Sequence, residues 1–295
     1  MATPPAHIRR VIFMGTPDLA VPPLLALHHA GYDIPLVVTR PDRRRTRRGG
    51  ASPSPVKSAA TELRIPVSDS IDDICEVEAD LAVVVAYGQI IATTLLERLA
   101  MVNIHFSLLP RWRGAAPVER AILAGDAKTG VCLISVEPEL DTGAVYRRQE
   151  TPIHPSDTLA SLRARLVDIG TGQLIDALHD GLGVPQPQTG EPVYAKKIKK
   201  SELEIDWTQS GELINRLIRV GGAWTTWRGR RLKVNGAEVV DEAAAGPPGS
   251  IDGTTVATGN GGLKLVIVQS EGKGPVAADA WVNGAHPTTH DLLGQ

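Results

Sequence analysis

The sequence predicts a Rossmann-like, doubly wound α/β domain followed by a smaller, β-rich domain. In the first two thirds of the chain, strand-like runs alternate with helical segments. These runs are apolar throughout, which is typical of parallel strands covered on both faces. After Trp207 the pattern changes to short strand-like runs separated by glycines, which indicates a small antiparallel domain. The chain has 295 residues, more than the roughly 100–200 of a typical single domain.

The elements of the first domain follow from apolar runs and from helix-start signals. Threonine and proline at Thr16 and Pro17 favour a helix that begins there, and further helices are expected at 115–124 and 156–182. In such a sheet the ligand is expected beyond the carboxyl ends of the strands. The five expected strands are residues 11–15, 35–39, 81–86, 102–106 and 131–136.

The second domain is expected to be a small OB-like β-barrel. A helix is predicted at 211–220, and strands are predicted at 231–234, 254–258 and 263–268. Residues 183–190, rich in proline and glycine, are expected to lack regular structure. The expected division is 1–188 for the α/β domain, 189–206 for a linker and 207–295 for the barrel.

Composition excludes several classes of protein. No run approaches the ~20 apolar residues that cross a bilayer, and the N-terminus lacks the apolar core of a secretory leader, so a cytoplasmic protein is expected. No metal-binding spacing occurs, so we expect no metal, and Cys75 and Cys132 are expected to be structural thiols. The spacing G-x-G-x-x-G is also missing after the first strand, which argues against a dinucleotide site.

Basic residues are unevenly distributed on a chain of net charge −2. Residues 40–50 hold six arginines against one acid, Asp42, and residues 196–233 hold ten Lys or Arg against four acids. Two such patches favour a polyanionic partner, although a solvated charged loop explains the arginine run equally well. From Asp206 onward there are eight Lys or Arg against nine acids, so the second domain is not basic as a whole.

The densest group of chemically active residues lies at the end of the fourth expected strand. Asn103 and His105 alternate along that strand, so their side chains share one face. A loop rich in proline and glycine follows at 107–114, and a carboxylate, Asp141, follows the next strand. An amide and an imidazole on one face favour a catalytic site over a buried structural histidine. The spacing does not decide whether Asp141 is catalytic or a turn residue ahead of Gly143.

These residues carry a family resemblance. The motif N-x-H-x-S-L-L-P-x-x-R-G at 103–114, with L-D-T-G at 140–143, resembles the folate-dependent formyltransferases. Within them the chain is similar to the methionyl-tRNA formyltransferase family over nearly its whole length. Supporting motifs are G-T-P-D at 15–18, P-S-P-V-K at 53–57, V-A-Y-G at 85–88, Y-A-x-K-I at 194–198 and I-D-W at 205–207.

The resemblance implies an activity and a set of site residues. An amine would attack the formyl carbon of 10-formyltetrahydrofolate, with Asn103 and a protonated His105 stabilising the oxyanion. Asp141 would favour the protonated imidazole and assist proton transfer. The resemblance implies a folate site formed by two segments of the chain. Its residues would be Tyr87, Gly88, Ile90, Ile91, Ser107, Leu108, Leu109 and Pro110.

The resemblance also implies that the amine belongs to methionyl-initiator tRNA and that the protein is a monomer. Arginines suit phosphates and guanine edges. The residues expected to bind tRNA are Arg40, Arg43, Arg44, Arg45, Arg47, Arg48 and Lys197. The alternatives are a formyltransferase for an amino sugar nucleotide or another small amine, a hydrolase that releases formate, and a non-catalytic RNA-binding protein.

Overall fold

The computed structural model describes residues 1–44, 51–288 and 290–295. These residues form two compact units, each of which takes segments from separate parts of the sequence. The first unit comprises Met1–Val118, Lys128–Pro152 and Ser161–Lys196. The second comprises Glu119–Ala127, Ile153–Ala160 and Lys197–Gln295. No helix of the described residues is long and apolar enough to cross a membrane.

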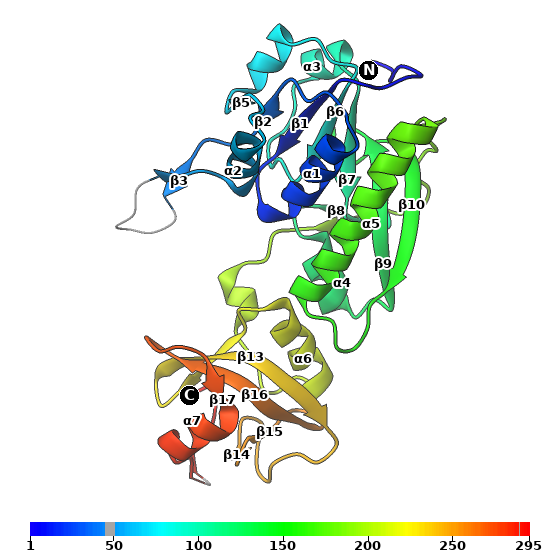
Figure 1. Ribbon diagram of the computed structural model, residues 1–295. Helices are drawn as coiled ribbons and strands as arrows, with labels where there is room; N and C mark the ends of the chain where they lie inside the picture. Colours follow the sequence, from blue (N-terminus) through cyan, green and yellow to red (C-terminus); the bar gives the residue numbers. More distant parts are fainter. Residues whose placement is uncertain (45–50, 289) are drawn as a thin grey trace. The chain divides into compact units, whose positions relative to one another are not determined.

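The first unit is built on a seven-stranded sheet with the order β10-β9-β7-β6-β1-β2-β5 (Figure 1). The strands β1, β2, β5, β6 and β7 pair in parallel, which confirms the predicted doubly wound α/β domain. Their buried, largely β-branched side chains explain why these strands were visible in the sequence. The strands are β1 Val11–Gly15, β2 Val37–Val38, β5 Val67–Ser68, β6 Leu81–Val85, β7 Met101–His105, β9 Lys128–Ser135 and β10 Val145–Pro152.

Two strands of this sheet differ from the expectation. The strand β9 runs antiparallel to β7, and β10, which the sequence analysis missed, continues the antiparallel edge. The middle of β10 is exposed and polar, because an edge strand has one open side, so it shows no apolar run. The sheet is therefore mixed, with its parallel part centred on β1 and β6.

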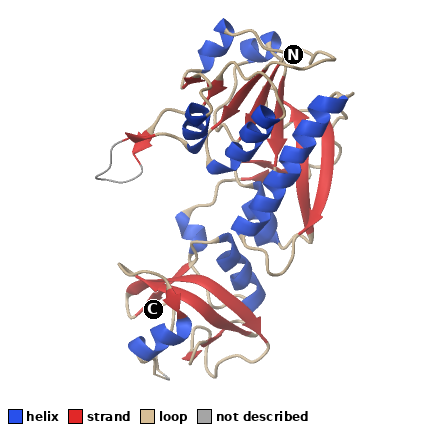
Figure 2. Ribbon diagram, viewed as in Figure 1, coloured by secondary structure: helices blue, strands red, loops and turns tan. Residues whose placement is uncertain are grey.

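Helices cover both faces of the sheet. On one face, side chains of η2 and α3 form a buried cluster with Ile12 and Met14 of β1. On the other face, α5 approaches so closely that a Cβ on Gly170 would lie 2.6 Å from Ile104 of β7. Figure 2 shows these helices beside the sheet. The helices of this unit are η1 Asp18–Ala20, α1 Val21–His29, α2 Pro55–Glu62, η2 Ile71–Glu76, α3 Thr93–Arg98 and α5 Leu159–Asp180, whereas α4 (Pro117–Ala124) belongs mostly to the second unit.

One prediction about the first unit was wrong in detail. Thr16 does not begin a helix: a short 3-10 turn starts at Asp18, and α1 begins at Val21. The Thr16 hydroxyl instead donates to the carbonyl of Tyr87. Residues 183–190 lack regular structure, as expected, but they are held in place, since Gln186 exchanges two backbone hydrogen bonds with Val145 and Gln188 bonds to the loop around Asp141. The strand β11 (Val193–Ala195) then pairs with β8 (Arg111–Gly114).

The second unit contains an antiparallel sheet with the order β12-β13-β16-β15-β14, on which β17 also pairs with β16. The helix α6 (Gly211–Val220) has the predicted bounds, and its Ile214 and Ile218 enter the core with Trp207 and Trp281. The predicted small β domain is confirmed. Its remaining elements are η3 Lys200–Leu203, β12 Trp224–Trp227, β13 Arg230–Val240, β14 Ile251–Asp252, β15 Thr255–Ala257, β16 Gly262–Ser270, β17 Val276–Ala277 and α7 Ala278–Ala285.

Candidate active site

The polar residues of β7 face away from α5. Ile104 points toward that helix, so Asn103 and His105, one position before and after it, point to the opposite face. Across the antiparallel pair they stand opposite Ile134 and Cys132 of β9, whose side chains share that face. Asn103 is half-buried, and no hydrogen bond joins its amide to another described residue. The amide is therefore available to a ligand at the carboxyl end of the strand.

The imidazole of His105 lies between two hydrogen-bond acceptors. Its Nε2 is 3.0 Å from the carbonyl oxygen of Trp112, and its Nδ1 is 3.5 Å from Oδ2 of Asp141. Only about 6% of the His105 side chain and 10% of the Asp141 side chain are exposed. A neutral imidazole has one N–H and can donate to only one of these groups, whereas an imidazolium can donate to both. Each ring nitrogen of His105 therefore faces one acceptor.

The carboxylate of Asp141 is fixed by its own loop and by the loop after β7. Its Oδ2 accepts a 2.8 Å hydrogen bond from the backbone N–H of Gly114. Two residues later, a Cβ at Gly143 would lie 1.8 Å from the Ser135 carbonyl oxygen, so only glycine fits there. The loop is thus held close to the end of β9. This geometry joins the three predicted catalytic residues, Asn103, His105 and Asp141, at one edge of the sheet.

Strained backbone is concentrated at this edge. Ala86, Trp112 and Asp141 have positive φ angles of 46°, 67° and 55°, in a region that side chains other than glycine rarely adopt. Each such residue costs on the order of 1–3 kcal/mol and persists only where its surroundings hold it. Three of the six such residues among those described lie in the candidate site, which is typical of functional geometry.

The loop after β7 presents both buried and accessible groups. Ser107 is buried, and its hydroxyl donates 2.6 Å to the carbonyl of Arg111, which closes the turn. Leu109 is also buried, against Cys132 and Ile134. Burial also raises the pKa of the Cys132 thiol, so this cysteine belongs to the core, as predicted. Leu108 and Pro110 are only half-buried. Of the predicted folate residues in this loop, Ser107 and Leu109 have structural contacts, and Leu108 and Pro110 have accessible surface.

The second predicted folate segment, residues 87–91, follows β6. Tyr87 and Ile91 are buried in the core cluster of the first unit, and burial raises the pKa of the Tyr87 hydroxyl. In contrast, Ile90 is 84% exposed, which is unusual for a large apolar side chain. Space around Gly88 is open except on the side of Arg40. This segment therefore offers a ligand the backbone of Gly88 and the side chain of Ile90.

Arg40 is turned toward the folate segment. Its Nη1 donates 3.2 Å to the carbonyl of Gly88, and its charge acts on the Tyr87 hydroxyl. Its backbone N–H donates to the hydroxyl of Thr16. Arg40 was expected among the tRNA-binding residues, but its guanidinium is engaged at the predicted folate site.

The other residues expected to bind tRNA are less fully described. The backbones of Arg43 and Arg44 form β3, which pairs with β4 (Ala51–Ser52). Arg45, Arg47 and Arg48 lie outside the described residues. Lys197, the first residue of the last segment of the second unit, is exposed.

Two family models match the chain. The model "Formyl transferase" matches residues 9–178, and "Formyl transferase, C-terminal domain" matches residues 197–286. A methionyl-tRNA formyltransferase of Roseobacter denitrificans is 42% identical, covering 94% of this chain and 96% of its own. That of a Jannaschia species is 44% identical, covering 94% and 97%. The chain belongs to the methionyl-tRNA formyltransferase family. It is therefore a formyl-transferring enzyme.

Three solved structures share the fold of this chain. HypX from Aquifex aeolicus, solved in complex with tetrahydrofolic acid, superposes with a TM-score of 0.66 at 16% identity, and covers 94% of this chain. This chain spans about half of HypX, 47% of its length. The sugar 3N-formyltransferase WlaRD gives a TM-score of 0.66 at 18% identity, covering 90% and 99%. A methionyl-tRNA formyltransferase from Clostridium thermocellum gives 0.56 at 19% identity, covering 78% and 93%. At these identities the likeness shows the fold alone.

Gln188 is a site residue that the sequence analysis missed. Its side chain bonds to the backbone of Asp141 and Gly143 and to the guanidinium of Arg113. A glutamine that follows a proline, as Gln188 follows Pro187, carries no sequence pattern that points to a site.

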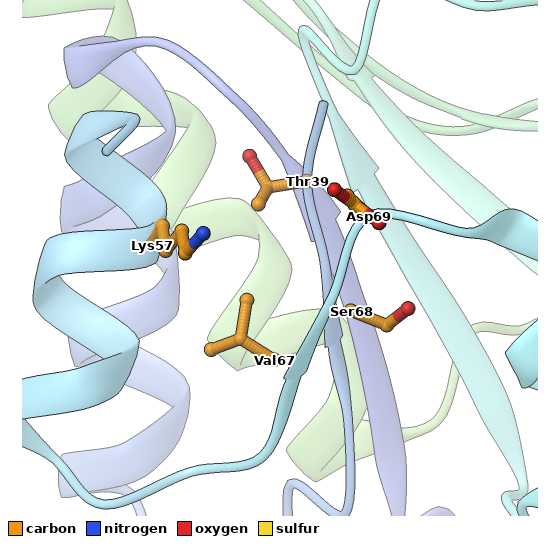
Figure 3. Close-up of a pocket in the computed structure, with 5 residues that line it drawn as sticks. All are labelled: Thr39, Lys57, Val67, Ser68 and Asp69. Carbon is orange, nitrogen blue, oxygen red and sulfur yellow. The ribbon is translucent and has the colours of Figure 1, made fainter. Parts of the chain in front are cut away.

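Two cavities lie away from the predicted site residues. One, of about 260 Å³, is lined by Thr39, Lys57, Val67, Ser68 and Asp69. In Figure 3 the Lys57 side chain extends from α2 toward the strand that carries Thr39. The other, of about 400 Å³, lies in the second unit beside Arg216 and Arg219. Among the described residues, no group of three or more His, Cys, Asp or Glu side chains is placed to hold a metal ion.

Proposed function

We propose that the enzyme transfers the formyl group of 10-formyltetrahydrofolate to the α-amino group of methionyl-initiator tRNA, for the start of protein synthesis. The proposal rests mainly on the arrangement of Asn103, His105 and Asp141 at the carboxyl end of β7. An amide without a partner among the described residues stands beside an imidazole held between two acceptors. Asn103 can donate to an oxygen that gains negative charge, and an imidazolium at His105 would place positive charge beside that oxygen.

The reaction needs a site that stabilises an oxyanion and moves one proton. The neutral amine adds to the formyl carbon, and the new C–N bond forms as the carbonyl oxygen becomes negative. Asn103 donates to that oxygen, and His105, as an imidazolium, adds positive charge beside it; one such donor is typically worth about 10²–10³ in rate. Asp141 keeps the imidazolium in place. The bond from carbon to N10 then breaks, and the proton lost by the amine leaves on N10.

The residues around the site suit a reduced folate. The co-substrate carries its formyl group on N10, which one methylene group joins to the reduced pterin. Ile90 offers exposed apolar surface and Gly88 offers open backbone, and both follow the strand next to β7. Small-molecule sites typically combine apolar walls with a few polar groups of this kind. The family's relatives and the bound tetrahydrofolate of HypX, a distant structure of the same fold, support the same class of ligand.

Basic residues support tRNA as the acceptor. The run of arginines from Arg43 to Arg48 and the exposed Lys197 can pair with phosphates. Full-length similarity to relatives named methionyl-tRNA formyltransferase supports this acceptor over an amino sugar nucleotide. Because phosphate contacts release bound cations, the KM for tRNA should rise steeply with salt concentration.

The test is formyl transfer from 10-formyltetrahydrofolate to four acceptors assayed side by side. They are charged initiator tRNA, charged elongator tRNA, free methionine and an amino sugar nucleotide. We expect transfer to the initiator tRNA above all. Turnover on the sugar nucleotide with none on tRNA would overturn the acceptor and keep the chemistry. Free formate without any formylated acceptor would mean a hydrolase.

A variant of His105 separates catalysis from binding. We expect His105→Ala to lower kcat by about 10²–10⁴, while the Kd for charged initiator tRNA stays within twofold. His28→Ala, at an exposed residue of α1, is the control for a lost imidazole. An equal loss of tRNA binding in His105→Ala would contradict the role given to this residue.

A further inference from the structure

The side chain of Gln188 uses every hydrogen-bonding position that it has. Its Nε2 donates to two backbone carbonyls, those of Asp141 and Gly143, at 2.8 Å each. Its Oε1 accepts from Nε and Nη2 of Arg113, at 3.1 and 2.7 Å. A primary amide has two donor hydrogens and two acceptor lone pairs, so no capacity is left for a substrate.

Arg113 fixes the orientation of this amide. A guanidinium only donates, and a backbone carbonyl only accepts, so the oxygen of Gln188 must face Arg113 and its nitrogen must face the carbonyls. The reverse orientation would break all four bonds. The chain Arg113–Gln188–Asp141 therefore joins the loop after β7 to the loop after β9 in one arrangement.

The loop held in this way contains the carboxylate that faces His105. Asp141 has a positive φ of 55°, and its own carbonyl is one of the two that Gln188 binds. Rotation of this backbone out of the left-handed region would move both the carbonyl and the side chain. The carboxylate then loses its 2.8 Å bond from Gly114 and its place 3.5 Å from the imidazole.

We propose that Gln188 is a positioning residue for formyl transfer: it holds the backbone of Asp141 so that the carboxylate faces His105. This inference rests on the proposed function, since it takes Asp141 as part of the catalytic group. Gln188 itself touches no reacting atom. Displacement of a catalytic group by about 1 Å costs roughly 10²-fold in rate, so a residue that sets the position of Asp141 acts mainly on kcat.

The first variant is Gln188→Glu, which keeps the shape and the acceptor for Arg113. It replaces the donating nitrogen by an oxygen that faces two carbonyls. We expect kcat to fall by about 10–100-fold, with both KM values within threefold. Gln186→Glu is the matched control, because it makes the same change two residues earlier, where the side chain donates only to the Val184 carbonyl. A kcat in Gln188→Glu equal to that of the control would overturn the proposal.

A double-variant cycle distinguishes positioning from general support of the fold. Asp141→Asn removes the charge through which Gln188 is inferred to act. If the inference holds, Gln188→Glu lowers kcat by less than threefold in the Asp141→Asn background. Fully multiplicative effects would show that Gln188 acts independently of Asp141 and would overturn it. If Gln188→Glu does not fold, the same double-variant cycle is measured with Gln188→Leu, which adds no charge.

The cycle can be read with whichever amine the wild-type enzyme formylates best. If the wild-type enzyme formylates only a small amine, the proposal that tRNA is the acceptor is wrong. The coupling between Gln188 and Asp141 could still be measured with that amine. The two failures are thereby distinguishable.

Discussion

At the scale of single residues, the contacts of Arg40 suggest a role other than the expected one in tRNA binding. It opens an arginine-rich run, yet its guanidinium donates to Gly88 at the segment proposed to bind folate. Its Nε is buried without a partner among the described residues. A buried, unpaired Nε donor beside an open glycine suits a ligand that accepts hydrogen bonds, because an unpaired buried donor is costly.

We therefore expect Arg40→Ala to raise the KM for 10-formyltetrahydrofolate by about tenfold, the worth of one charged hydrogen bond. The KM for tRNA should stay within twofold. Arg10→Ala, which removes a surface ion pair with Asp33, is the control. If the KM for tRNA rose instead and its salt slope fell by about one, Arg40 would be a phosphate contact.

Residue types at strand ends made part of the candidate site predictable. Asn103 and His105 stand out as polar side chains on one face of a buried strand, whereas Asp141 was selected only through the family resemblance. The spacing could not show that both ring nitrogens of His105 face acceptors, because one of these is the backbone carbonyl of Trp112. Gln188 was unpredictable for a related reason, since its partners are mostly main-chain atoms that no side-chain pattern encodes.

At the scale of elements, α5 has two glycines with opposite roles. A Cβ on Gly170 would lie 2.6 Å from Ile104 and 3.2 Å from Val131, whereas Gly172 has nothing within 4 Å. The first glycine lets α5 approach β7, the strand that carries Asn103 and His105. The second glycine makes no such contact, so it only weakens the helix, because alanine is a better helix former.

Gly170→Ala should lower the free energy of unfolding by about 1–3 kcal/mol through overpacking. In contrast, Gly172→Ala should raise it by about 0.5–1 kcal/mol. The two variants make the same chemical change on one helix, so each is the control of the other in a denaturant titration. Equal effects of the same sign would contradict the close approach at Gly170.

Another element-scale feature is the base of the arginine loop. Lys57 of α2 pairs with Asp42 at 2.9 Å, just before β3. Three residues earlier than Lys57, the Ser54 hydroxyl lies 2.7 Å from the buried hydroxyl of Thr39. These contacts explain the P-S-P-V-K motif as a structural support of the loop base, with Ser54 also capping α2.

Variants of the ion pair between Lys57 and Asp42 show whether Lys57 supports the arginine-rich loop or contacts the RNA directly. If Lys57 supports the loop through Asp42, Lys57→Ala and Asp42→Ala should each raise the KM for tRNA by about twofold to fivefold, and the double variant by no more. If Lys57 binds phosphate directly, Asp42→Ala should instead lower that KM, because a negative charge is lost. Kinetics at fixed salt concentration decide between them.

How well the elements were predicted depends on burial. The helix α6 was predicted to the residue because one face carries Ile214 and Ile218 and the other is polar. The strand β10 was missed because its edge position lets charged residues occupy it. The antiparallel direction of β9 was likewise hidden, since a buried strand is apolar in either direction.

At the scale of the whole molecule, the pH dependence of stability has one clear contributor in the second unit. Arg228 donates to both oxygens of Asp291, at 3.0 and 2.8 Å, and the N–H of Thr288 donates to one of them. These bonds hold the pKa of Asp291 well below its usual range. A carboxyl with a lowered folded-state pKa stabilises the fold above its unfolded pKa of about 3.9, and this contribution is lost as pH falls below it.

Asp291→Asn should therefore lower the Tm at pH 7, and the difference from wild type should shrink as the pH falls below about 4. Asp252→Asn, at an exposed residue of β14, is the control and should have little effect at either pH. Thermal melts at pH 7, 5 and 3 measure this. If the difference in Tm between Asp291→Asn and wild type were the same at pH 3 as at pH 7, the effect would come from altered packing and not from the lost charge.

The two compact units do not coincide with two continuous stretches of sequence. Arg219 of α6 donates to the carbonyls of His154 and Asp157, and Arg120 pairs with Glu202 at 2.8 Å, all within the second unit. An expression fragment that starts at Lys197 would leave out Glu119–Ala127 and Ile153–Ala160. Its half-buried Arg219 would lose both acceptors. Experiments on isolated halves would therefore use incomplete units. A circular permutant keeps every segment of both units and avoids this problem.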